Sequence, residues 1–263
     1  MVWGKEMDQL FQSTSLGPLT LKNRIVRSAT NEHLSEPDGQ VTRAWADALI
    51  ELAAHEVGLV ISGHFCVDAS QRADEGQPVL DEKTDREILR CAADGVHQYG
   101  SKVLIQLSHS GIKAMERVNG AAAKHPEDFS LSELDRLVER FVYAAECCKV
   151  CGFDGVQIHT AHGYLLSNFL NPSENRGTDA YGGSLENRFR LIARILSAVR
   201  AACGDDFAVL VKADCNGCGD FPALLKLYEG CGVDAVEVSG VDFNHRAGQK
   251  TPFYAQALLQ GSN

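Results

Sequence analysis

The chain contains no apolar stretch long enough to cross a membrane. Spanning a bilayer takes about 20 consecutive apolar residues, and no run in the 263 residues approaches that length. Basic charge is also scarce, because 25 Lys and Arg residues stand against 35 Asp and Glu residues, for a net charge of −10. An acidic chain repels polyanions, which argues against nucleic acid or an anionic membrane as the main partner. The first residues lack the apolar core of a signal peptide, which predicts a cytoplasmic protein.

The chain contains nine cysteines. Because no secretion signal is recognised, their thiols are expected to be reduced. Two C-x-x-C pairs occur, Cys148/Cys151 and Cys215/Cys218. Their separation does not match the spacing of a zinc ribbon, and we predict no metal site. No G-x-G-x-x-G motif follows the first predicted strand, which disfavours a Rossmann fold.

Apolar runs alternate with amphipathic stretches along most of the chain. The apolar runs predict strands at 21–29, 58–63, 102–111, 155–159, 207–213 and 233–240. The amphipathic stretches predict helices at 42–58, 84–98, 131–152, 184–202 and 222–231. Strands that are apolar throughout and alternate with helices form a parallel sheet covered on both faces. We therefore expect one α/β domain over residues 1–263, a TIM-type (β/α) barrel with about six of its eight βα units.

The most informative segment lies between Gly152 and Arg190. Its run GVQIH (155–159) predicts a short buried strand, and His159, His162 and Tyr164 follow at the strand's end. Barrel enzymes keep their active sites at this end of the strands. Two neutral imidazoles can donate N–H groups to one carbonyl oxygen while a phenol protonates a neighbouring carbon. The same spacing also fits a metal-binding pair or two buried core histidines, so both alternatives stay open here.

Several longer motifs follow one another in order. They are LGPLTLKNRIVRSATNEH, IQLSHSG, GFDGVQIHTAHGYLLSNFLNP, RGTDAYGGSLENRFRL, VLVKADC and GVDAVEVSG. Together they resemble the Old Yellow Enzyme family of FMN-dependent NAD(P)H:flavin oxidoreductases, the ene-reductases. The resemblance implies a TIM barrel, FMN as cofactor and NAD(P)H as electron donor. It also implies a small-molecule substrate, an α,β-unsaturated carbonyl compound whose C=C bond is reduced.

The resemblance implies roles for individual residues as well. His159 and His162 would hold the substrate's carbonyl oxygen, and Tyr164 would donate the proton. Gln106 would bind the flavin's pyrimidine edge, and Lys212 would face flavin N1, where a cation stabilises the reduced anion. The turn after the first strand would supply the remaining residues: Ala29, Thr30 and Asn31 along the isoalloxazine ring, and His33 towards the substrate.

The region after Gly240 departs from the pattern of a complete barrel. It is long enough for a loop and part of one helix, and we find no seventh or eighth strand there. The loops after those strands usually form the phosphate site. Two unpaired sheet edges are therefore expected, through which two copies could associate.

Three functions remain open from the sequence. The first is a working FMN-dependent ene-reductase. The second is a truncated, inactive family member that acts as a binding or assembly module or has no role. The third is a metal-dependent barrel hydrolase that uses His159 and His162.

Overall fold

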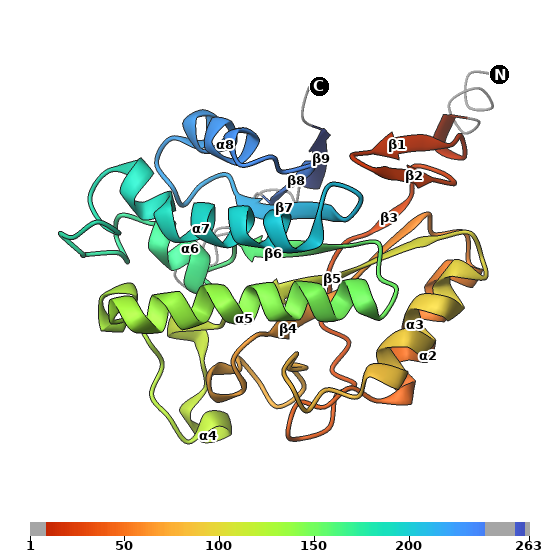
Figure 1. Ribbon diagram of the computed structural model, residues 1–263, viewed down its shortest axis with the longest axis horizontal. Helices are drawn as coiled ribbons and strands as arrows, with labels where there is room; N and C mark the ends of the chain where they lie inside the picture. Colours follow the sequence, from red (N-terminus) through yellow and green to blue (C-terminus); the bar gives the residue numbers. More distant parts are fainter. Residues whose placement is uncertain (1–8, 240–255, 261–263) are drawn as a thin grey trace, which may run out of the picture.

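A curved, mainly parallel sheet dominates the computed structural model, which describes residues 9–239 and 256–260 (Figure 1). Six strands pair in parallel, each with the next one along the chain. They are β3 (Val26–Arg27), β4 (Leu59–Cys66), β5 (Lys102–Ser108), β6 (Gly155–Thr160), β7 (Ala208–Asp214) and β8 (Ala235–Ser239). This sequential order is that of a (β/α) barrel. The prediction of an incomplete TIM-type barrel with six parallel strands is confirmed.

Helices link these strands and cover the outer face of the sheet (Figure 1). The longer ones are α2 (Arg43–Ala54), α3 (Arg86–His97), α5 (Leu131–Val150), α7 (Leu185–Cys203) and α8 (Phe221–Gly230). A capping box opens α5: Ser130 Oγ accepts from the backbone N–H of Glu133, and the Glu133 carboxylate accepts from the backbone N–H of Ser130. The main core lies between these helices and the sheet. In the part of the chain that the structure describes, no helix is long and apolar enough to cross a membrane.

The predicted first strand, 21–29, is wrong in its first half. A two-stranded hairpin, β1 (Thr14–Leu16) and β2 (Leu19–Leu21), ends there, and only β3 joins the main sheet. Asn23 separates the two because its side chain accepts from the N–H of Ile25 and donates to the carbonyl of Glu56. Such local side-chain bonds compete with a strand's ladder.

The hairpin closes the N-terminal end of the barrel interior. Its three leucines form one cluster with residues near the starts of the strands, namely Leu16, Leu19 and Leu21 with Leu59, Ile61, Leu104, Ala208, Leu210 and Ala235. Burying this apolar surface anchors the hairpin across the strand starts. The interior is therefore apolar at the N-terminal end, and its polar side chains lie towards the C-terminal end.

The prediction of an unpaired edge on the sixth strand is also wrong. Strand β9 (Gln256–Gln260) pairs with β8 in the antiparallel direction and satisfies its edge. The predicted loop and partial helix fall on a region where 240–255 and 261–263 lie outside the described residues. The part that is described, 256–260, is a strand because an open edge offers backbone donors and acceptors to any extended segment that reaches it.

Candidate active site

The structure brings together the three predicted residues at the end of the fourth barrel strand. His159 lies in β6, His162 lies in the loop after it, and Tyr164 is the N-cap of α6 (Leu165–Leu170). The ring of His159 lies 5.0 Å from that of His162 and 4.9 Å from that of Tyr164, between centroids. His162 has a φ of 64°, a left-handed conformation that few residues adopt. That turn is what folds the loop back so that its ring meets His159.

A third imidazole, His64 of β4, completes this cluster and was missed from the sequence. Its ring lies 5.0 Å from the ring of Tyr164 and 6.2 Å from that of His159. The predicted strand ended at Gly63, whereas β4 continues to Cys66 through a register shift between Ile61 and His64. We call His64, His159, His162 and Tyr164 the ring cluster.

All four groups of the ring cluster are neutral near pH 7. Burial lowers the pKa of His64 to about 4 and that of His162 to about 3. Burial likewise lowers the pKa of His159 well below its usual value and raises the pKa of Tyr164 to about 12. The cluster thus offers uncharged imidazole nitrogens and a protonated phenol in a water-poor site, where hydrogen bonds are strong.

Hydrogen bonds fix one of these imidazoles and leave two nitrogens unpartnered. Nε2 of His162 lies 2.7 Å from Ser239 Oγ, and its backbone N–H donates to Asp214 Oδ2 at 2.5 Å. By contrast, Nδ1 of His159 and Nε2 of His64 are buried without a hydrogen-bond partner in the structure. Buried polar atoms are nearly always paired in a complete structure. Two such atoms in one cluster indicate a place where a bound molecule supplies the missing partner.

A chain of buried polar side chains crosses the barrel interior beside the ring cluster. Gln106 Nε2 donates to Gln157 Oε1 at 2.6 Å, and Gln157 Nε2 donates to Glu237 Oε2 at 2.8 Å. The other carboxylate oxygen of Glu237 accepts from Ser28 at 2.5 Å and lies 3.1 Å from the ammonium of Lys212. We call these five residues the polar relay.

The register of the sheet explains why the relay and the ring cluster adjoin. His159 pairs with Lys212 across β6 and β7, and Lys212 pairs with Glu237 across β7 and β8. Because side chains alternate along a strand, residues in one row of a parallel sheet point to the same face. Sequence reasoning found Gln106 and Lys212 but missed Gln157 and Glu237. Gln157 lies two residues before His159 and Glu237 two residues before Ser239, and this spacing along a strand could have identified them.

The relay also fixes the orientation of the Gln106 amide. Glu237 can only accept, so the Gln157 amide must turn its NH₂ towards it and its oxygen towards Gln106. Gln106 then uses one N–H on Gln157, which leaves its second N–H and its carbonyl oxygen for another partner. A planar partner with adjacent donor and acceptor groups matches this amide edge.

The turn after β3 places its four predicted residues at the rim. The Ala29 side chain is half-buried, Thr30 is exposed, and the Asn31 amide reaches Asp74 at 3.3 Å. His33 is 63% exposed and also lies against Asp74, at 3.4 Å. Asp74 was not found from the sequence because nothing in its loop motif distinguishes it from a solvated acid.

A half-buried lysine stands over the phenol. Lys113 Nζ lies 5.3 Å from the centre of the Tyr164 ring. Burial lowers the pKa of Lys113. A cation over an aromatic face is attracted by the ring quadrupole, which helps to hold the ring in one orientation.

The side-chain geometry does not support the metal-dependent alternative. Within 9–239 and 256–260, no three His, Cys, Asp or Glu side chains converge as a metal site would require. The cysteines at 66–231 are all free thiols, and Cys147, Cys148 and Cys151 are packed into the main core.

The chain is similar to known proteins in both sequence and structure. Residues 9–214 match the NADH:flavin oxidoreductase / NADH oxidase family. The chain is 33% identical over 246 residues to an NADPH dehydrogenase of Bacillus licheniformis, covering 88% of this chain and 73% of that one. It is 29% identical over 251 residues to an NADH oxidase of Thermoanaerobacter brockii, of which it spans 39%. Among solved structures, an Old Yellow Enzyme homologue from Zymomonas mobilis superposes with a TM-score of 0.80 at 25% identity, covering 88% of this chain and 73% of that one.

Proposed function

The chain belongs to the NADH:flavin oxidoreductase / NADH oxidase family, and from this premise we propose that it uses FMN and NAD(P)H to reduce the C=C bond of α,β-unsaturated carbonyl compounds. The observation that carries the proposal is the ring cluster. It combines two unpartnered buried imidazole nitrogens with a protonated phenol at the carboxyl end of a barrel strand.

The side chains of the polar relay fit an FMN ring. The free carbonyl and N–H of Gln106 match the alternating acceptors and donor of a flavin's pyrimidine edge. Lys212 brings a positive charge to the same interior, next to Glu237, whose other carboxylate oxygen accepts from Gln157. Ala29, Thr30 and Asn31, on the turn after β3, would line the ring from its rim. When bound, FMN supplies the redox chemistry, taking hydride from NAD(P)H and passing it to the substrate's β-carbon.

The histidines of the cluster would bind and polarise the substrate. A carbonyl oxygen accepting from His159 Nδ1 and from the His162 ring would satisfy the nitrogen that now lacks a partner. Because both imidazoles are neutral, they donate hydrogen bonds without surrendering a full proton. The negative charge that develops on the oxygen is then stabilised in a site that excludes water. His33, on the rim with Asp74, would contact the outer part of the substrate.

Tyr164 would protonate the α-carbon. Its pKa is raised to about 12 by burial, so the phenol holds its proton near pH 7. Lys113 lies over the ring and would stabilise the phenolate formed when that proton leaves. Tyr164 regains a proton from solvent before the next turnover.

The test is anaerobic NADPH and NADH oxidation by FMN-supplemented protein with 2-cyclohexenone as acceptor. We expect nucleotide oxidation to require the enone and cyclohexanone to accumulate in equal amount. Flavin-dependent nucleotide oxidation that reduces only oxygen or a dye would keep the family assignment and defeat the enone proposal. No oxidation with any acceptor would favour the inactive, binding-module alternative.

A further inference from the structure

The ring cluster contains one imidazole that the proposed chemistry does not use. The carbonyl oxygen of an enone would satisfy His159, whereas Nε2 of His64 has no hydrogen-bond partner among the residues that the structure describes. His64 is 9% exposed, more than Gln106 and Lys212 at 3% and 2%. A ligand that reaches those two residues is therefore not kept from His64 by burial.

An irregularity in β4 turns His64 into the barrel interior. Ile61 belongs to the apolar cluster at the N-terminal end of that interior, so strict alternation along the strand would turn Gly63 and Phe65 inward as well. The register shift between Ile61 and His64 moves this pattern by one residue. Phe65 accordingly packs outward on Trp45 of α2, at 5.2 Å between ring centroids, and His64 faces the ring cluster.

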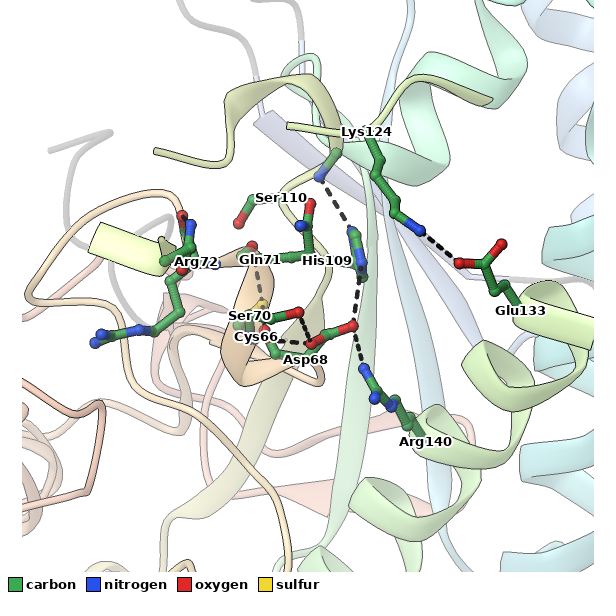
Figure 2. Close-up of polar contacts among 12 residues, drawn as sticks. Cys66, Asp68, Ser70, Gln71, Arg72, His109, Ser110, Lys124, Glu133 and Arg140 are labelled. Carbon is green, nitrogen blue, oxygen red and sulfur yellow. Dashed lines mark hydrogen bonds and ion pairs between the residues drawn. The ribbon is translucent and has the colours of Figure 1, made fainter. Parts of the chain in front are cut away.

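Hydrogen bonds to the backbone fix the position of His64. Its carbonyl accepts from Gln77 Nε2 at 3.3 Å. Two residues further on, the Cys66 thiol donates to the carbonyls of Asp68 and Gln71, at 3.1 and 3.3 Å, and so holds the loop after β4 against the end of the strand (Figure 2). These bonds place the imidazole without using its nitrogens, which leaves Nε2 for a ligand.

The strand order places His64 beside the residues that would bind the flavin. His64 pairs with Gln106 across β4 and β5, and Lys212 lies on β7, on the other side of Gln106. The pyrimidine edge of a flavin runs from N1 through the C2 carbonyl, N3 and the C4 carbonyl to N5. With N1 at Lys212 and the middle of this edge at Gln106, the same direction along the sheet brings the C4 carbonyl to His64.

The contact between His64 and Tyr164 fits this placement. Their ring centroids lie 5.0 Å apart, and Tyr164 would protonate the carbon next to the one that takes hydride from N5. His64 thus lies between Gln106, at the middle of the pyrimidine edge, and the phenol that acts beside N5. The C4 carbonyl is the flavin group between those two positions. It accepts hydrogen bonds in both redox states, whereas N5 gains a proton on reduction, so a donor suits the carbonyl.

We propose that His64 donates a hydrogen bond from Nε2 to the C4 carbonyl oxygen of the bound flavin and thereby raises the flavin's midpoint potential. The inference rests on the proposed use of FMN and adds a residue to its site. A neutral imidazole carries one N–H, and an acceptor at Nε2 draws that proton to Nε2. The reduced flavin shares its negative charge with its carbonyl oxygens, so this donor stabilises the reduced form more than the oxidised form.

The test is the midpoint potential of FMN bound to the full chain, measured without substrate by reduction against a reference dye. His64→Leu removes the donor and should lower the potential by about 30 mV, which corresponds to a tenfold loss of stabilisation of the reduced form in a two-electron couple. His64→Gln places an amide N–H near the position of Nε2 and should restore most of the wild-type potential. His64→Asn, whose amide ends short of that position, should behave like His64→Leu and replaces it if leucine prevents folding.

His109→Leu is the matched control. It removes another buried imidazole, whose pKa burial also lowers to about 4, but whose ring lies against Phe129 and faces Asp68 (Figure 2). The potential should then stay at the wild-type value. An equal shift in His109→Leu and His64→Leu would overturn the inference.

Three further results separate the alternatives. An unchanged or higher potential in both His64→Leu and His64→Asn would overturn the role of His64 at the C4 carbonyl. An unchanged potential together with a raised KM for 2-cyclohexenone would assign Nε2 to the substrate instead. Wild-type protein that binds no FMN would defeat the proposed function as well, whereas bound FMN that NADPH bleaches, with no effect of the His64 variants on its potential, would defeat this inference alone.

Discussion

The ammonium of Lys212 lies 3.1 Å from the carboxylate of Glu237, and the two side chains are 3% and 4% exposed. Each side chain neutralises the charge of the other in a barrel interior that is apolar at one end. Removing one partner of such a pair leaves an isolated buried charge, which is strongly unfavourable. The relationship thus links stability to the cationic environment that an FMN ring would meet.

Glu237→Gln should lower the free energy of unfolding by about 3 kcal/mol, because it strands the Lys212 charge. Urea denaturation of the FMN-free protein measures this. Asp47→Asn is the control, since Asp47 pairs with Arg43 in solvent, and it should leave the unfolding midpoint unchanged. With FMN bound, the uncompensated cation of Glu237→Gln should raise the flavin's midpoint potential. Equal stability losses in the two variants would contradict this account of the pair.

Tyr164→Phe should slow enone reduction about 10²–10⁴-fold, the range for loss of a general acid. Flavin reduction by NADPH should keep its rate, because that half-reaction needs no proton at the α-carbon. Stopped-flow spectroscopy separates the two half-reactions. Tyr99→Phe removes an exposed phenol and should affect neither. Equal loss in both half-reactions would remove the proton-donor role from Tyr164.

Ser239→Ala should lower kcat/KM for the enone about tenfold while flavin reduction is unchanged. The hydroxyl lies 2.7 Å from His162 Nε2 and fixes the ring that would hold the carbonyl oxygen. Without it the imidazole loses one hydrogen-bond anchor, and misplacement of a positioning group reduces the rate. Ser173→Ala, at an exposed position, serves as the control. A wild-type kcat/KM for Ser239→Ala would mean that His162 is held by its backbone alone.

Acid should destabilise the protein before its carboxylates titrate. The folded pKa values of His64 and His162 are about 4 and about 3, below the ordinary value of about 6.5. Between pH 6.5 and 4 the unfolded chain binds protons that the folded chain cannot. The free energy of unfolding therefore decreases as the pH is lowered through that window, by up to about 1.4 kcal/mol per pH unit for each histidine. Urea unfolding at pH 7.5, 6.0 and 5.0 should give a shallower slope for His64→Gln than for the wild type, and equal slopes would contradict this.

Most of the barrel could be predicted because its strands and helices obey local rules. The apolar runs that became β5, β6 and β7 are recognisable within a few residues each. The hairpin was missed because Leu16 and Leu19 are apolar for a reason that lies far along the chain, the cluster with Ala208 and Ala235. Strand β9 could not be predicted either, since its pairing depends on an edge that exists only in three dimensions.

The site residues also include some that could be predicted from the sequence and some that could not. His159, His162 and Tyr164 were found because they lie within six residues of each other. His64, Gln157 and Glu237 reach the same interior from three separate strands, and only the sheet register brings them together. Each sits inside an apolar run, where a lone polar residue has no local explanation. A search for polar residues two positions apart along predicted strands would have found Gln157 and Glu237.

The central claim is that the polar relay holds a flavin that passes hydride to a substrate bound at the ring cluster. The most direct measurement is the absorbance spectrum of the purified protein after incubation with excess FMN and gel filtration, recorded before and after NADPH is added anaerobically. The account predicts a retained flavin band near about 450 nm that NADPH bleaches and 2-cyclohexenone restores. A folded protein that leaves the column without flavin, or one whose flavin NADPH and NADH fail to bleach, would contradict it.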